Sequence, residues 1–243
     1  MHKSVTIIIP AYNEAGNIEG ALDAVVSAVA PAVPDYEIVV VDDGSRDETA
    51  ALAKSRARNN PRIRVVSHFP NRGYGYTFVH GVKLATKSYV TVFPGDNDMS
   101  ALTLRDLIVQ IGEADIITSH CAGENPRSRF RKTLSKTFTG LMNLLFGLRL
   151  KYYNGSFICR REILLSIPIR SQGLAVLAEC LVRIIKKGYT YKSIPFVHTG
   201  RKSDQSKALN GKSFFRVSKT ILILVRDIYF VQPGQKKHAA FNH

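Results

Sequence analysis

The sequence predicts an α/β fold: a doubly wound, mostly parallel sheet flanked by helices, with amphipathic helices toward the C-terminus. In the first half, short β-branched runs alternate with segments in which apolar residues recur at helical spacing, and such βα units build parallel sheets. The strand-like runs are apolar on successive residues, which is typical of strands buried on both faces. With 243 residues, 45% hydrophobic and 22% charged, the chain has the size and composition of one large domain.

The first half is expected to alternate strands and helices from the start. Val5 to Ile9 is the first β-branched run and stops at Pro10. The helix that follows has apolar residues on one face and stops at Pro31. The expected strands cover residues 5–9, 36–41, 63–67, 89–93 and 115–119. The expected helices cover residues 17–30, 47–59, 76–85 and 102–111.

The second half is expected to contain three helices, over residues 129–148, 173–187 and 212–230. The last of them combines a basic stripe with aromatic and aliphatic residues. Such a helix either packs on the sheet or lies in a membrane interface beside anionic lipids, and we favour membrane contact for 129–148, 212–230, or both. The basic stripe of the last helix consists of Lys212, Arg216, Lys219 and Arg226. No apolar run in the sequence approaches the ~18 residues of a membrane span.

Charge is divided unevenly along the chain. Residues 1–122 hold 11 Lys and Arg against 14 Asp and Glu, whereas residues 123–243 hold 23 against 5, a net charge of +18. The second half therefore attracts polyanions such as nucleic acid, lipid headgroups or phosphate substrates. A nucleic-acid-binding protein is disfavoured, because we identify no RNA- or DNA-binding module and no stacking aromatic residues interleaved with the basic ones.

Cysteine usage and the N-terminal residues indicate where the protein works. The three cysteines are widely spaced, without a CxxC pair, which indicates buried thiols in a reducing compartment. The first residues lead directly into a strand-like run, so we expect no secretory signal peptide and a cytoplasmic location. We expect one domain with two halves, 1–122 and 123–232, and a disordered tail over 233–243.

Polar residues follow three of the predicted strands directly. Two carboxylates spaced i, i+2, Asp96 and Asp98 on either side of Asn97, can converge on a hard divalent cation that bridges a diphosphate. Asp-x-Asp is also common in ordinary turns, but ligands of parallel sheets bind beyond the carboxyl ends of the strands, where this pair is expected to lie.

The other two strand ends carry similar groups. Asp42 and Asp43 are followed by Gly44 and Ser45, so they either hold a turn and cap the next helix or accept hydrogen bonds from a ribose or a base. These two interpretations are compatible, because the cap needs only one aspartate. The segment 12–14, Tyr-Asn-Glu, is likewise either a turn or a wall of the same pocket.

Together these residues resemble the signature of family 2 inverting glycosyltransferases with the GT-A fold. Within that family the chain most resembles the dolichol-phosphate mannose synthase group, which transfers a sugar from a nucleotide sugar to a polyprenyl phosphate. The likeness continues in the second half, through a basic helix, an Asn-Gly-Ser-Phe segment, a helix with Glu179, and an Arg-x-x-x-x-Ser-Lys loop. The matching segments are Ile8–Glu14, Val40–Ser45, Asp96–Asp98, Arg131–Lys136, Asn154–Phe157 and Arg201–Lys207.

The resemblance implies a donor site in residues 1–122 and an acceptor or membrane side in residues 123–232. The donor is expected to be GDP-mannose, held by Pro10, Tyr12, Glu14, Asp42, Asp43, Asp96 and Asn97. The cation is expected to be Mg²⁺ or Mn²⁺, bound by Asp96 and Asp98. The expected catalytic residues are Asp98, Arg131 and Arg201. The acceptor phosphate is expected to be held by Arg131, Ser135 and Lys207, since Arg presents a bidentate fork to phosphate.

Two positions depart from the family pattern. Ser100 stands where the metal motif usually has a glutamine, and His120 replaces an arginine that follows the next strand. Glu179 lies on a largely apolar helix and is either a buried ion-pair partner or a carboxylate near the acceptor phosphate. Members of this group often carry membrane-spanning helices, whereas no apolar run in this sequence is long enough for one, so membrane contact is expected to be peripheral. The alternative function is a family 2 enzyme that uses a UDP-sugar and a soluble or polysaccharide acceptor.

Overall fold

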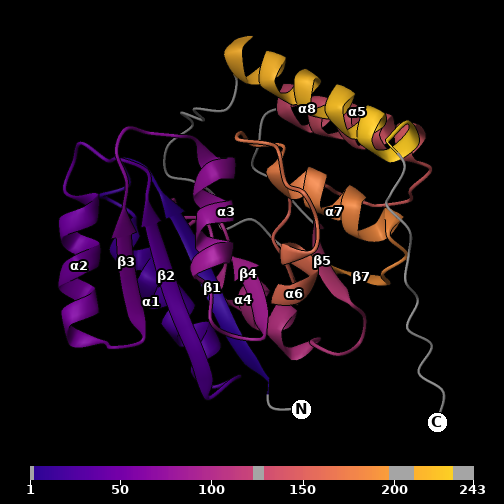
Figure 1. The fold of residues 1–243 in the computed structure, drawn as a ribbon. Helices are drawn as coiled ribbons and strands as arrows, with labels where there is room; N and C mark the ends of the chain where they lie inside the picture. Colours follow the sequence, from indigo (N-terminus) through magenta and orange to yellow (C-terminus); the bar gives the residue numbers. More distant parts are fainter. Residues whose placement is uncertain (1–2, 123–128, 197–210, 232–243) are drawn as a thin grey trace.

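A computed structural model describes residues 3–122, 129–196 and 211–231 (Figure 1). Its seven-stranded sheet has the order β3-β2-β1-β4-β6-β5-β7, with all pairs parallel except those of β6. The strands are β1 (Ser4–Ala11), β2 (Asp35–Asp42), β3 (Ile63–Ser67), β4 (Tyr89–Val92), β5 (Ile116–Cys121), β6 (Phe157–Arg160) and β7 (Tyr191–Phe196). The helices are α1 (Ile18–Val29), α2 (Thr49–Asn59), α3 (Tyr74–Leu84), α4 (Ala101–Val109), α5 (Arg129–Phe146), α6 (Arg161–Leu165), α7 (Val176–Lys186) and α8 (Gly211–Tyr229).

The α/β class with a mostly parallel sheet is confirmed, and the predicted strands and helices are present with ends shifted by up to three residues. Helix α3 starts at Tyr74 rather than at residue 76, so Gly75 belongs to the helix. Two strands were not predicted. β6 has only four residues, and β7 alternates in burial and contains Pro195, which is acceptable at the edge of a sheet.

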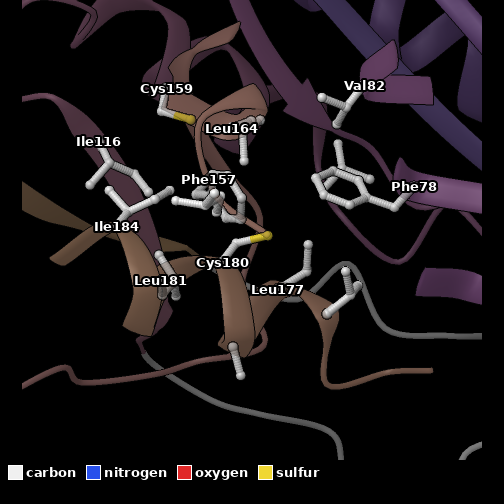
Figure 2. Packing of buried hydrophobic residues seen from close by; sticks show 14 of the residues in the cluster. Phe78, Val82, Ile116, Phe157, Cys159, Leu164, Leu177, Cys180, Leu181 and Ile184 are labelled. Carbon is white, nitrogen blue, oxygen red and sulfur yellow. The ribbon is translucent and has the colours of Figure 1, made fainter. Parts of the chain in front are cut away.

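The sheet is buried on both faces, as the apolar runs predict. In β1, Ile7 and Ile9 belong to the cluster under α1 and α4, whereas Ile8 belongs to the cluster on the opposite face. Figure 2 shows part of this second cluster, in which Phe78 of α3 and Cys180 of α7 surround Phe157 of β6. β6 and β7 come from the second half of the chain, so one sheet takes strands from both predicted halves.

The cysteines are free thiols. Cys159 and Cys180 are buried and Cys121 is half-buried. Burial in apolar surroundings raises the pKa of the Cys159 and Cys180 thiols well above the ordinary value, so both are protonated at neutral pH. These two side chains therefore act as small apolar core residues.

Helices α5 and α8 lie side by side over α7 (Figure 1). Near the end of α8, the Tyr229 hydroxyl donates a hydrogen bond to the Leu145 carbonyl at 2.7 Å, and the ring of Tyr229 stacks on Phe146. Among the described residues, no helix is long and apolar enough to cross a membrane. The predicted tail, residues 233–243, lies outside the described residues.

Candidate active site at the carboxyl ends of the strands

The loops after β1 and β2 are tied together by hydrogen bonds. The Asn13 N–H donates to Ser45 Oγ at 2.9 Å, and the Arg46 N–H donates to Asn13 Oδ1 at 2.9 Å. The Glu14 N–H donates to Thr49 Oγ1 at 2.8 Å. Asn13 adopts a positive φ of 53°, a conformation that asparagine tolerates better than most residues. These bonds fix the edge of the sheet at which Tyr12, Glu14, Asp42 and Asp43 were predicted to meet.

Both aspartates at the end of β2 are buried and hold backbone N–H groups. Asp42 Oδ1 accepts from the Ser45 N–H at 3.2 Å. The Asp43 carboxylate accepts from the Arg72 N–H at 2.7 Å and from the Gly73 N–H at 2.9 Å, at the start of α3. A carboxylate offers about four lone-pair sites, so each aspartate keeps acceptor capacity for a ligand. The turn and binding interpretations are thus compatible for both residues.

An aromatic cluster beside Asp43 was not predicted from the sequence. His68 Nδ1 lies 3.4 Å from Asp43 Oδ1, and the His68 ring contacts Tyr76 edge-on and His80 at a tilt. The Arg72 guanidinium covers the Tyr76 ring and donates to its hydroxyl at 2.6 Å. Burial, together with the neighbouring positive groups, lowers the pKa of His80, which keeps that ring neutral at pH 7.

The aspartate loop after β4 is folded closely against β1. The Asp98 N–H donates to Asp96 Oδ1 at 3.1 Å, and Asn97 between them has a φ of 57°. A Cβ on Gly95 would lie 2.6 Å from the Pro10 carbonyl oxygen, so only glycine allows this approach. The three residues 96–98 are half-buried.

The donor set of this loop fits a hard divalent cation. Mg²⁺ is commonly held by one or two carboxylates together with substrate phosphates and water, and Asp96 and Asp98 supply two carboxylates. In the part of the chain that the structure describes, no group of three or more His, Cys, Asp or Glu residues forms a complete protein cage. Ser100 is the N-cap of α4: its Oγ accepts from the Thr103 N–H at 3.2 Å.

Asp98 lines a cavity of about 60 Å³ between the aspartate loop and the second half of the chain. Gly155 lies so close to the Ser119 carbonyl that any side chain there would overlap it. The Ser119 hydroxyl donates to the Ser156 carbonyl at 2.7 Å, which fixes the back of the cavity. The lining residues are Pro94, Asp98, Met99, Ser119, Tyr152, Asn154, Gly155, Ser156 and Phe196.

Helix α5 packs beside this cavity. Phe138 contacts the Tyr153 ring edge-on, next to the lining residue Tyr152, and the Tyr153 hydroxyl donates to Asn143 Oδ1. Arg131 and Ser135 precede Phe138 by seven and three residues, so the three share one face of the helix. Both are half-buried, whereas residues on the opposite face of α5 are exposed.

Four further residues singled out in the sequence do not line the cavity or lie outside the described residues. Arg201 and Lys207 lie outside the described residues. His120 alternates with Ser119 along β5, does not line the cavity, and has its Nδ1 2.9 Å from Ser193 Oγ. Burial and the nearby positive charge of Lys151 lower the pKa of His120. Glu179 is fully buried and paired with Arg183, which matches the ion-pair interpretation of this residue.

Sequence reasoning missed several lining residues. Tyr152, Ser119 and Phe196 carried no motif of their own, and only the adjacent Asn-Gly-Ser-Phe segment pointed to this part of the chain. Arg72 and Gly73 were also missed, although their position just after β3 could have placed them at the same edge of the sheet.

The chain is similar to known proteins in sequence and in fold. The model of glycosyl transferase family 2 matches residues 6–179. A polyprenol monophosphomannose synthase of Mycolicibacterium smegmatis is 29% identical over 83% of this chain and 79% of its own length. An undecaprenyl-phosphate 4-deoxy-4-formamido-L-arabinose transferase of Edwardsiella ictaluri is 26% identical over 84% of this chain and 62% of its own.

Solved structures show the same fold. Glucosyl-3-phosphoglycerate synthase of Mycobacterium tuberculosis, in complex with Mn²⁺, UDP and phosphoglyceric acid, is 19% identical with a TM-score of 0.70 over 95% of this chain and 80% of its own. The same enzyme with Mg²⁺ and UDP gives a TM-score of 0.71 over 92% of this chain and 79% of its own, at 19% identity.

The fold is that of the GT-A glycosyltransferases. The chain belongs to glycosyl transferase family 2, since the family match covers well over half of it. It spans about three fifths of the length of two curated relatives, the Edwardsiella ictaluri transferase and an uncharacterized glycosyltransferase of Escherichia coli (strain K12), which is 24% identical over 78% of this chain.

Proposed function

We propose that this protein is a metal-dependent, inverting glycosyltransferase that moves a sugar from a nucleotide sugar to a polyprenyl phosphate at a membrane surface. The proposed donor is GDP-mannose, following the resemblance to the dolichol-phosphate mannose synthase group and the relative named polyprenol monophosphomannose synthase. The observation that carries the proposal is the cavity in which Asp98 of the donor side meets the Tyr152–Ser156 segment, which the basic helix α5 contacts through Phe138 and Tyr153.

The donor side is proposed to use the three strand-end segments. Tyr12, Glu14 and the Asp42–Asp43 pair would bind the nucleoside, and Asp96 and Asp98 would hold Mg²⁺ or Mn²⁺ against its diphosphate. A divalent cation at this position supplies charge neutralisation for the departing nucleoside diphosphate. One enzyme of the same fold, glucosyl-3-phosphoglycerate synthase, is known with Mn²⁺ or Mg²⁺ and UDP, which supports a divalent cation in the donor site of this fold.

The acceptor side needs positively charged side chains more than it needs a general base. A phosphate monoester is already anionic near neutral pH, so it can attack the anomeric carbon without a strong general base. Arg131 and Ser135 share the face of α5 that carries Phe138, and are proposed to orient this phosphate in line with the leaving group. Arg201 and Lys207 are proposed to complete this acceptor site.

The membrane side is proposed to be the outer surface of α5 and α8. On α8, Phe215, Leu222 and Tyr229 are exposed and recur every seven residues, with the exposed Lys219 and Arg226 between them. On α5, Phe130, Leu134, Leu141 and Leu144 are exposed. Apolar side chains interspersed with basic ones suit the headgroup region of an anionic bilayer. We call these nine residues the docking face.

The test is a transfer assay with GDP-mannose, polyprenyl phosphate and Mn²⁺. Asp98→Asn should lower the transfer rate at least about 100-fold, because it would remove a carboxylate ligand of the cation that neutralises the leaving diphosphate. Its thermal unfolding midpoint should match the unmodified protein, since Asp98 is half-buried in a loop. Full activity of Asp98→Asn would contradict the metal assignment, and failure of the unmodified protein to bind any nucleotide would contradict the enzyme assignment.

A soluble acceptor with a UDP-sugar is the second candidate. It is favoured by structural similarity to the glucosyl-3-phosphoglycerate synthase complexes with UDP and phosphoglyceric acid. Calorimetric titration of GDP, UDP and their sugars, each with and without Mn²⁺, separates the donors. Transfer to a short-chain phosphate acceptor without any lipid or detergent would favour the soluble route.

A further inference from the structure

A buried network of charges joins α8 to α7. Glu179 is 0% exposed, and its Oε1 accepts from Arg183 Nε at 2.8 Å. The same guanidinium donates through a second nitrogen to Asp227 Oδ2 of α8, also at 2.8 Å. The side chains of Arg183 and Asp227 are only 6% and 5% exposed. Arg170 and Arg226 complete the pairing of Asp227 from the solvent side.

Glu179 also holds the loop that precedes α7. Its carboxylate accepts from the Ser171 N–H at 2.7 Å and from the Arg170 N–H at 3.1 Å. From α8, the Thr220 hydroxyl lies 3.4 Å from the Ser171 hydroxyl. The position of residues 170–172 therefore depends on the two helices whose charges meet at Arg183.

The same loop supports the start of α3. The Gly75 N–H donates to the Gln172 carbonyl at 3.0 Å. A Cβ on Gly73 would lie 2.6 Å from that carbonyl oxygen, and one on Gly75 would overlap the Ser171 carbonyl. Gly73 in turn donates its N–H to the Asp43 carboxylate. The backbone of residues 171–172 thus touches the backbone at the start of α3, next to the N–H groups that Asp43 accepts from.

We propose that Asp227 and Arg183 are positioning residues for the nucleotide pocket, acting through Glu179, the 170–172 loop and the start of α3 at Gly73 and Gly75. This inference rests on the proposed function, because it requires a nucleotide site at Asp42 and Asp43. Because α8 also carries part of the docking face, membrane attachment of that helix would bear on the geometry of the donor site through the same contacts.

Two physical arguments favour a rigid connection between Arg183 and the start of α3. Without the Asp227 charge, the buried Arg183 guanidinium keeps its ion pair with Glu179 but loses the charge-assisted hydrogen bond that joins it to α8, so the surrounding backbone relaxes to bring solvent or another acceptor to it. From Glu179 onward, every contact is a direct one. The Glu179 carboxylate binds the Ser171 N–H, and the backbone of residues 171–172 touches the backbone of Gly73 and Gly75 with no flexible side chain between them. A displacement of the 170–172 loop must therefore shift Gly73 or break its contact.

The experiment compares Asp227→Asn with Glu162→Gln, a matched carboxylate-to-amide change. Glu162 lies on α6, its side chain is 75% exposed, and it pairs only loosely with Arg160 at 3.5 Å. Nucleotide affinity is measured by calorimetry with Mn²⁺, at a temperature at which all variants are folded by circular dichroism. Asp227→Asn should weaken binding at least about fivefold, and Glu162→Gln should leave it unchanged.

Each result has one meaning. If the unmodified protein binds no nucleotide, the proposed function fails. If it binds and Asp227→Asn binds equally well, the network is only structural and the inference is overturned, even if the unfolding midpoint falls. If Asp227→Asn does not fold, hydrogen exchange of the unmodified protein decides. Nucleotide should slow exchange of the Arg170 and Ser171 amides, because coupling is reciprocal, and unchanged exchange would overturn the inference.

Discussion

Gly95 brings the aspartate loop into contact with Pro10, since a Cβ at residue 95 would lie 2.6 Å from the Pro10 carbonyl oxygen. The end of β1 therefore sets the position of Asp96 and Asp98. Gly95→Ala should displace the loop and weaken Mn²⁺-dependent nucleotide binding about tenfold or more, which calorimetry can measure. The β1 core on both sides of the sheet should stay intact, so far-UV circular dichroism should not change.

Gly140→Ala is the control for that substitution. Gly140 is exposed in α5, and a Cβ there would meet no atom within 4 Å. This change should leave nucleotide binding unaltered and stabilise the protein by about 0.5–1 kcal/mol, because alanine favours a helix more than glycine does. Equal loss of binding in both variants would contradict the role given to Gly95.

Ser100→Ala separates a helix cap from a metal ligand. Ser100 Oγ accepts from the Thr103 N–H and lies 2.9 Å from Thr103 Oγ1. Loss of the cap should lower the free energy of unfolding by about 1 kcal/mol in a urea titration. The Mn²⁺ concentration for half-maximal transfer should not change, and a marked rise in that concentration would show that Ser100 acts on the metal.

Asp43→Ala should damage both stability and donor binding. It leaves the N–H groups of Arg72 and Gly73 without their acceptor, which costs about 2 kcal/mol in urea unfolding and loosens the start of α3. Asp23→Ala is the control, because Asp23 is exposed on α1 and its surface pair with Arg56 is worth at most about 1 kcal/mol. Unchanged nucleotide affinity in Asp43→Ala would contradict the donor site proposed here.

Much of the donor half was predictable because its signals are local. Apolar runs such as Val5–Ile9 define buried strands, and the polar residues after each run must gather at one edge of a parallel sheet. The clustering of the loops after β1 and β2 follows from that rule. The hydrogen bonds that join these loops, such as the one from Asn13 to Ser45, do not follow from that rule. They depend on the left-handed backbone conformation of Asn13, which the sequence alone does not determine.

The acceptor side was less predictable because it is built from distant pieces. Ser119, Tyr152 and Phe196 meet only after β6 inserts antiparallel between β4 and β5, and a four-residue strand has too short a pattern to predict. Similarly, Glu179 left two interpretations open, and only its contact with Arg183 and the loop backbone distinguishes them.

Asp115 should contribute to the pH dependence of stability. Its carboxylate accepts from the Thr190 N–H at 2.9 Å and from the Thr190 hydroxyl at 2.7 Å, and the backbone bond is the main reason that its pKa lies below the ordinary 3.8. The lowered pKa stabilises the folded protein above pH 3.8, and this contribution disappears as the pH falls through the folded value. In urea unfolding at pH 7, 5 and 3, Asp115→Asn should lose less stability on acidification than the unmodified protein. Identical pH dependence would contradict this assignment.

Leu222→Glu tests the docking face on α8. Leu222 is 70% exposed beside Lys219 and Arg226, and Leu102 on α4, 68% exposed, offers a matched control away from α5 and α8 (Figure 1). Burial of a leucine in the headgroup region is worth about 1.5–3 kcal/mol, so Leu222→Glu should reduce binding to anionic phosphatidylglycerol vesicles about tenfold or more. Leu102→Glu should bind the vesicles as tightly as the unmodified protein. Added salt should weaken vesicle binding by Leu102→Glu and by the unmodified protein, because it screens the basic side chains. Equal vesicle binding by Leu222→Glu and Leu102→Glu would place membrane contact elsewhere on the molecule.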